Sequence, residues 1–99
     1  MAKLLTELKN GEPDATWFVY LLRCADGSLF TGIGTGVPRR LEQHNAGTAS
    51  HYTRSRLPAV LVFQEAQFSR TLALKRELAI KVLSRQEKEL LIRAEGWAT

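Results

Sequence analysis

Two short apolar runs separated by a three-residue turn constrain the fold of this chain more than any other feature. Trp17–Cys24 is rich in aromatic and branched apolar residues, and Ser28–Ile33 has a similar, shorter pattern. Between them stands Ala25-Asp26-Gly27, which contains the residue types that reverse a chain. The pattern predicts a β-hairpin, because two strands joined by so short a turn pair antiparallel.

The length of the turn decides which side chains share a face of the hairpin. A two-residue turn would place Tyr20 and Phe30 on opposite faces of the sheet. A three-residue loop, with Gly27 in the left-handed conformation, pairs Tyr20 with Gly32. Tyr20 and Phe30 then share a face as diagonal neighbours. The sequence permits both turns, and the choice matters because Tyr20 and Phe30 belong to the motifs described below.

A helix and a polar loop are expected after the hairpin. The helix should run from Val37 or Pro38 to Ala46, because proline is tolerated in the first turn and Gly47 is a natural stop. Residues 48–58 are polar and basic and are predicted to form a loop.

The remaining pattern predicts one strand and two helices. Ala59–Phe68 is rich in valine, leucine and phenylalanine, as strands are. A long helix is expected over residues 69–83, and the capping-box pattern of Ser84 and Glu87 should start another helix that ends near Ala94. A DNA-binding helix-turn-helix is an alternative for this last pair, although its turn lacks the usual glycine. The predicted fold is α+β, with a central three-stranded antiparallel sheet flanked by helices.

The 99 residues suffice for one domain and leave no room for a second hydrophobic core. We expect a loose N-terminal leader over residues 1–15, the domain over 16–94 and a C-terminal tail over 95–99. Charged residues interrupt the apolar positions of the leader, which argues against a signal peptide, and no stretch is long enough to span a bilayer. The single cysteine, Cys24, fits a reducing compartment. A cytoplasmic protein without a membrane segment is therefore expected.

Basic residues are concentrated in the middle of the chain. The formal net charge is +4, and the stretch 39–56 holds four arginines, two histidines and one acid. Such a patch favours a polyanionic partner such as nucleic acid, because arginines bind phosphates and an aromatic ring can stack on an unpaired base. The alternatives are a solvated surface and a loop that only covers the sheet edge. The candidate nucleic-acid contacts are Arg39, His51, Tyr52, Arg54 and Arg56.

Glu77 is a carboxylate inside an apolar stripe of the long predicted helix. Its neighbours at helical spacing are Ala73, Leu74 and Ile80. Buried carboxylates are rare unless they are paired, hydrogen-bonded or bound to a metal. Spacing alone favours an ion pair over a metal site, and the possible partners are Arg76, Lys81 and Arg40.

Arg40 and His44 stand four residues apart on one predicted helix and therefore face the same way. A guanidinium can grip a phosphate through two hydrogen bonds and stabilise negative charge that builds during attack. The alternative is a pair of solvated side chains on an exposed helix face. Tyr20 can equally be an ordinary strand tyrosine that buries its ring and bonds through its hydroxyl.

In their order and spacing, these residues resemble the motifs of the GIY-YIG nuclease family, and most of all its small, stand-alone, single-domain bacterial branch. The likeness runs from about Trp17 to Ile92. The motif positions are Phe18-Val19-Tyr20, Phe30-Thr31-Gly32, Arg40, His44 and Glu77. Linking stretches also match, and they are residues 38–47, 51–56 and 83–88.

The resemblance implies a divalent-metal-dependent endonuclease that hydrolyses phosphodiester bonds of nucleic acid, with DNA as the expected substrate. It implies that Glu77 holds the catalytic ion, Mg²⁺ or Mn²⁺. Arg40 would grip the scissile phosphate with His44 as its helper. Tyr20 would help to position or deprotonate the attacking water.

Phe30 departs from the family pattern, because the second motif of the family begins with tyrosine. Phenylalanine keeps the ring but cannot bond to water or exchange a proton. If the missing phenol is the catalytic base, the chain is a nucleic-acid-binding module with weak or no catalysis. If Tyr20 or the metal ion suffices, activity survives. Gly32 retains the glycine of the second motif.

Overall fold

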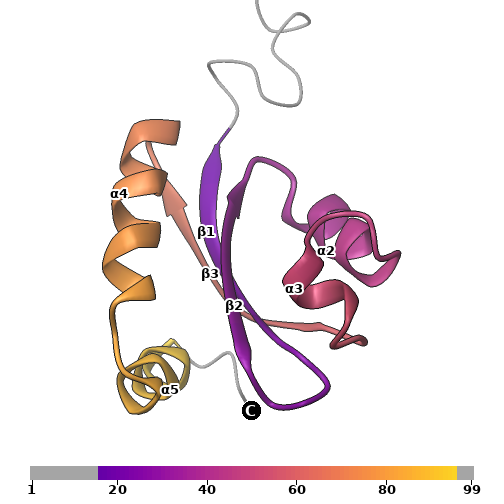
Figure 1. The fold of residues 1–99 in the computed structure, drawn as a ribbon. Coiled ribbons are helices and arrows are strands. Elements are labelled where there is room, and N and C mark those ends of the chain that lie inside the picture. The colour runs from indigo at the N-terminus through magenta and orange to yellow at the C-terminus, as the bar shows by residue number, and fades with distance from the viewer. Residues whose placement is uncertain (1–15, 96–99) are drawn as a thin grey trace, which may run out of the picture.

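The computed structural model of the chain describes residues 16–95 and shows three layers, with a sheet between two pairs of helices (Figure 1). The sheet is antiparallel and has the strand order β2-β1-β3. Its strands are β1 (Trp17–Arg23), β2 (Leu29–Gly34) and β3 (Val60–Gln67). One side of the sheet carries α2 (Val37–Asn45) and α3 (His51–Arg54), and the other carries α4 (Arg70–Lys81) and α5 (Arg85–Ala94). The predicted α+β fold is confirmed.

The hairpin of β1 and β2 has the three-residue loop. Gly27 adopts a φ of 85°, and its N–H donates to the carbonyl of Cys24 over 2.9 Å. Tyr20 pairs with Gly32 in the resulting register. Tyr20 and Phe30 therefore lie on the same face of the sheet, which confirms the register required by the motif pattern.

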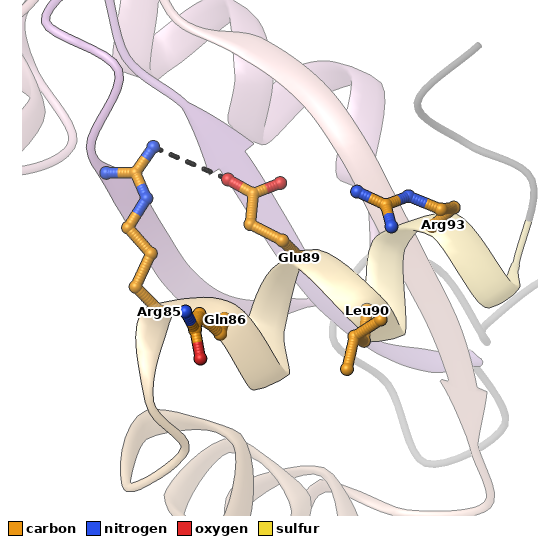
Figure 2. Close-up of a pocket in the computed structure, with 5 residues that line it drawn as sticks. All are labelled: Arg85, Gln86, Glu89, Leu90 and Arg93. Carbon is orange, nitrogen blue, oxygen red and sulfur yellow. Dashed lines mark hydrogen bonds and ion pairs between the residues drawn. The ribbon is translucent and has the colours of Figure 1, made fainter.

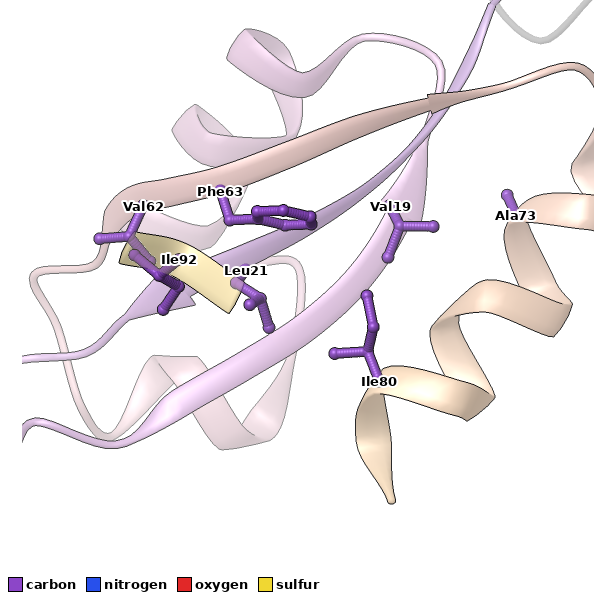
Figure 3. Packing of buried hydrophobic residues seen from close by; sticks show 7 residues of the cluster. All are labelled: Val19, Leu21, Val62, Phe63, Ala73, Ile80 and Ile92. Carbon is purple, nitrogen blue, oxygen red and sulfur yellow. The ribbon is translucent and has the colours of Figure 1, made fainter. Parts of the chain in front are cut away.

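Alternation along β1 gives the sheet a core on each face. Val19 and Leu21 face α4 and α5, whereas Tyr20 and Leu22 face α2. A bulge in β3 helps to fill the first core, because Val62 is the extra residue where the register shifts. Figure 3 shows this core, which contains Val19, Leu21, Val62, Phe63, Ala73, Ile80 and Ile92.

The prediction of a loop over residues 48–58 is wrong for its central part. Residues His51–Arg54 form the short helix α3. The Ser50 side chain caps it by accepting hydrogen bonds from the backbone N–H groups of Tyr52 and Thr53. Thr53 is fully buried. The polar composition of this segment gave no helical pattern of apolar residues. The helix is instead stabilised by the Ser50 cap and by the burial of Thr53.

The two C-terminal helices follow the predicted starts. The Ser69 side chain accepts from the N–H of Leu72 over 3.1 Å, and the capping box of Ser84 and Glu87 is present. The long helix ends at Lys81, two residues earlier than predicted. No described helix combines the length and apolar character that crossing a membrane requires. The predicted leader and all but the first residue of the predicted tail lie outside the described residues, so the division of the chain stays a prediction.

Candidate active site

Tyr20 of β1 and His44 of α2 form a hydrogen bond on the face of the sheet that α2 covers. The Tyr20 hydroxyl lies 3.0 Å from Nε2 of His44. Tyr20 is 1% exposed and His44 is fully buried. The alternative of a solvated His44 is therefore wrong. His44 lies with Val37 on the buried face of α2, which packs on the sheet.

Two glycines of β2 make room for the site. A Cβ atom at Gly32 would lie 2.7 Å from both Cζ and the hydroxyl oxygen of Tyr20, so the phenol crosses directly over this position. A Cβ atom at Gly34 would lie 3.1 Å from Cγ of Arg40. The absence of side chains at Gly32 and Gly34 thus lets the phenol and the arginine stem approach the strand.

Arg40 and burial set the protonation of the pair. Burial raises the pKa of the Tyr20 phenol above its ordinary value, and the neighbouring Arg40 guanidinium offsets part of the rise. Burial also lowers the pKa of His44, and Arg40 lowers it further. The imidazole is therefore neutral at pH 7. Arg40 is half-buried and donates to Oε1 of Gln43 over 2.6 Å.

A row of side chains continues from His44 to the surface. The Phe30 ring lies edge-on to His44, with 4.9 Å between ring centroids, and 6.1 Å from the Tyr52 ring. The Arg56 guanidinium covers Tyr52 at 3.9 Å from its centroid. Phe30 is half-buried. It keeps the packing role of an aromatic ring while providing no hydroxyl.

Glu77 approaches from the other helical layer. Its side chain is only 14% exposed, and its Oε2 lies 3.3 Å from Nζ of Lys81. Lys81 is thus the partner among the three considered, while Arg76 pairs with Glu65 at 2.7 Å. The negative charge of Glu77 also contributes to the raised pKa of Tyr20, after burial, so its electric field reaches the phenol. Tyr20, Phe30, Arg40 and His44 gather on the α2 face, and the charge of Glu77 acts on Tyr20 from α4.

The donor chemistry at Glu77 fits a metal ion that is shared with a substrate. Within residues 16–95, no three histidine, cysteine, aspartate or glutamate side chains cluster closely enough to hold an ion. Mg²⁺ often binds through one or two carboxylates, several waters and substrate phosphates. One shielded carboxylate therefore suits an ion that completes its coordination with waters and substrate phosphates rather than with further protein ligands.

Some of the predicted nucleic-acid contacts are exposed, and one is held by other groups of the protein. Arg56 is engaged, because its Nε donates to Asp26 over 3.0 Å and its Nη1 donates to the carbonyl of Tyr52 over 2.9 Å. Arg54 and His51 are exposed, hydrogen-bonded to each other over 2.8 Å, and line a polar hollow of about 170 Å³. Arg39 is exposed at the start of α2.

Asn45 and Thr53 hold the site together, and the sequence did not identify either role. Asn45 accepts from the N–H of Ala59 over 2.8 Å and donates to its carbonyl over 2.9 Å, which ties the end of α2 to the approach to β3. Thr53 places its hydroxyl 2.9 Å from Nδ1 of His44. The available signal was the position of Thr53, three residues after the capping Ser50.

A pocket on α5 lies in the opposite layer and contains none of the predicted site residues. Glu89 accepts two hydrogen bonds from Arg23, at 2.7 and 2.8 Å, and a longer one from Arg85. Arg85 also donates to the carbonyl of Gly27 over 2.7 Å. These contacts fasten α5 to the hairpin, which is a structural role. Figure 2 shows the lining residues Arg85, Gln86, Glu89, Leu90 and Arg93.

Known proteins match this chain over most of its length. Residues 16–90 match the family model described as the GIY-YIG catalytic domain. A UPF0213 protein of Desulfotalea psychrophila is 49% identical over 79 residues, which are 79% of this chain and 72% of that protein. A UPF0213 protein of Staphylococcus haemolyticus is 46% identical over 78 residues, covering 79% of this chain and 95% of that one. The solution NMR structure of a UPF0213 protein from Bacillus halodurans is similar with a TM-score of 0.56 and 41% identity, over 84% of this chain and 88% of that chain.

Proposed function

The chain belongs to the family of GIY-YIG catalytic domains, and from this we propose that it is a divalent-metal-dependent endonuclease acting on nucleic acid. DNA is the expected substrate. The observation that carries the proposal is the buried Tyr20–His44 hydrogen bond, which lies next to the Arg40 guanidinium. A phenol, a neutral imidazole and a cation in one place can accept a proton and stabilise a phosphate.

Arg40 is the proposed phosphate-binding residue. Its guanidinium is half-buried, and its present side-chain partner is the neutral amide of Gln43. Exchanging an amide for a phosphate costs little, because hydrogen bonds to charged groups are stronger than those between neutral groups.

Tyr20 and His44 are the proposed proton-handling pair. His44 is neutral at pH 7, so its Nε2 has a lone pair for the phenolic proton. The lowered pKa of His44 and the raised pKa of Tyr20 both oppose this transfer, so it depends on the Arg40 charge, which lowers the pKa of the phenol. The phenolate formed in this way would be stabilised by Arg40 and could take a proton from the attacking water. The high pKa of the buried phenol makes the phenolate a strong base once it forms.

Glu77 is the proposed ligand of the divalent ion, Mg²⁺ or Mn²⁺. When bound, such an ion neutralises phosphate charge and makes water a better nucleophile. The Lys81 ammonium competes for the same carboxylate at 3.3 Å. Location in the cytoplasm belongs to the same proposal and rests on the free, buried Cys24.

Phe30 supports a second candidate function, a nucleic-acid-binding module without turnover. The basic residues of α2 and α3 would serve either function. The two candidates differ in whether catalysis needs a hydroxyl at position 30, because phenylalanine can neither bond to a water nor exchange a proton.

The test compares two adjacent arginines of α2 in a cleavage assay with Mg²⁺ or Mn²⁺ on single-stranded, double-stranded and branched DNA and RNA. Arg40→Ala should lower kcat by about 10²–10³-fold, the usual loss for one transition-state donor. The exposed neighbour serves as the matched control, and Arg39→Ala should raise KM while leaving kcat nearly unchanged. Equal kcat values for the two variants would remove Arg40 from the catalytic role.

A further inference from the structure

Thr53 is a buried residue that touches the proposed site without belonging to any family motif considered above. It lies in α3, is fully buried, and its hydroxyl is 2.9 Å from Nδ1 of His44. The other ring nitrogen, Nε2, faces the Tyr20 hydroxyl at 3.0 Å. His44 is thus held between two hydroxyl groups, one from the sheet and one from α3.

The direction of these hydrogen bonds follows from the available donors and acceptors. The Thr53 hydroxyl has one hydrogen, which it donates to the backbone carbonyl of Ser50 over 3.4 Å. A hydroxyl that donates to Ser50 accepts from His44, and in this arrangement Nδ1 carries the ring proton.

Tyr20 gives an independent indication of the same direction. Its other polar neighbour is the Arg40 guanidinium, which has donors only and cannot accept the phenolic proton. Nε2 of His44 is the acceptor within reach, so it carries no hydrogen. Both ends of the chain of hydrogen bonds therefore assign the proton of the neutral imidazole to Nδ1.

We propose that Thr53 is a positioning residue that fixes His44 in the tautomer protonated at Nδ1. Nε2 is thereby kept free to take the proton of Tyr20. In that step the O–H bond of the phenol breaks and an N–H bond forms at Nε2, which leaves a phenolate and an imidazolium. The phenolate then takes a proton from the attacking water and becomes a phenol again. The imidazolium keeps its Nδ1–H bond to Thr53 and gives its Nε2 proton to the leaving oxygen at the end of turnover.

The proposed tautomer rests on the structure alone, and its use in catalysis rests on the proposed nuclease function. The first measurement is therefore independent of activity. His51→Gln leaves His44 as the only histidine. Its ring ¹⁵N chemical shifts then report which nitrogen carries the proton. We expect Nδ1 to be protonated. A spectrum with the proton on Nε2 overturns the proposal without any further variant.

Two substitutions of Thr53 separate the hydroxyl from the side-chain volume. In the same background, Thr53→Val keeps the volume and removes the acceptor, so the ring should shift toward the Nε2-protonated tautomer. Thr53→Ser keeps the hydroxyl and should retain the wild-type tautomer. If Thr53→Val leaves the ring shifts unchanged, the positioning role is wrong.

Cleavage assays then connect the tautomer to turnover. Thr53→Val should lower kcat by about 10–100-fold, as is usual when the partner that orients an imidazole is lost, with KM unchanged. Thr53→Ser should restore most of kcat. A wild-type protein that cleaves no substrate contradicts the nuclease function, while the ring shifts still decide the role of Thr53. Wild-type cleavage with full activity in Thr53→Val contradicts only the role of Thr53.

Discussion

At the scale of single residues, the site is arranged around one phenol. His44 bonds the hydroxyl of Tyr20, Arg40 opposes the rise in its pKa, and Gly32 leaves space for its ring. A second phenol is missing, because Phe30 fills the position beside His44 with a ring that has no hydroxyl. The chemistry of the site depends on whether one phenol is enough.

Phe30→Tyr tests this point. The substitution adds a hydroxyl to a half-buried ring, so the fold should be retained. We expect metal-dependent cleavage to rise, by up to about 10²–10⁴-fold if the hydroxyl serves as a positioned proton acceptor. Phe30→Leu, which removes the ring, is the control for packing. Activity that is equal in wild type and Phe30→Tyr would mean that the Tyr20 phenol suffices.

Gly32 and Gly34 form a matched pair for testing the packing of the site. Gly32→Ala would place a methyl group 2.7 Å from a fully buried phenol, and we expect a loss of about 1–3 kcal/mol in unfolding free energy. Gly34→Ala meets the flexible stem of Arg40 at 3.1 Å and should cost little stability. Urea unfolding measures both. A loss for Gly32→Ala as small as that for Gly34→Ala would show that Tyr20 can move aside.

At the scale of elements, α2 and α3 act together to place His44. Asn45 ties α2 to the backbone of Ala59, and Thr53 of α3 contacts the imidazole. The turn alone left the hairpin register open between a two-residue and a three-residue loop, and the family motifs selected the three-residue loop that Gly27 permits with its φ of 85°. The short helix α3 could not be predicted, since four residues gain their order from tertiary contacts rather than from helical periodicity.

Asn45→Ala tests the link between α2 and β3. The substitution leaves the buried N–H and C=O of Ala59 without their side-chain partner. Each unsatisfied buried group costs about 1–3 kcal/mol, so we expect a loss of at least about 2 kcal/mol in unfolding free energy. Asn45→Asp keeps the acceptor for the N–H and should lose less. Stability within error of wild type for Asn45→Ala would argue against this link.

At the scale of the whole molecule, the sheet lies between the layer of α2 and α3, which holds Arg40 and His44, and the layer of α4 and α5, which holds Glu77 (Figure 1). The order of motifs along the sequence selected the candidate residues and implied that they share one cleft. It did not predict that His44 would be buried or that Glu77 would come from the opposite layer. Polar residues at helical spacing look the same whether they face solvent or a sheet. Their burial depends on how α2 and α4 pack, which no local pattern specifies.

The internal pairing of Arg56 leads to a prediction about nucleic-acid binding. Its charge is offset by Asp26, whereas Arg54 is exposed and its side chain bonds only His51 among the described residues. Arg54→Ala should reduce the slope of log K against log salt by about 1, as expected for one phosphate contact. Arg56→Ala should change the slope less. Fluorescence anisotropy at several salt concentrations measures both, and an equal reduction would show that Arg56 leaves Asp26 on binding.

The role of Glu77 as the metal ligand is the central claim, because it joins the two layers into one site. The most direct test compares cleavage by wild type and Glu77→Gln, with Mg²⁺ and with a chelator, in both the natural and the Phe30→Tyr backgrounds. Glutamine keeps the shape of the side chain and removes the charge. We predict metal-dependent cleavage that falls by more than about 100-fold in Glu77→Gln, since a bound ion stabilises the transition state by several kcal/mol. Cleavage that is equal in wild type and Glu77→Gln, or that persists with the chelator, would contradict the account.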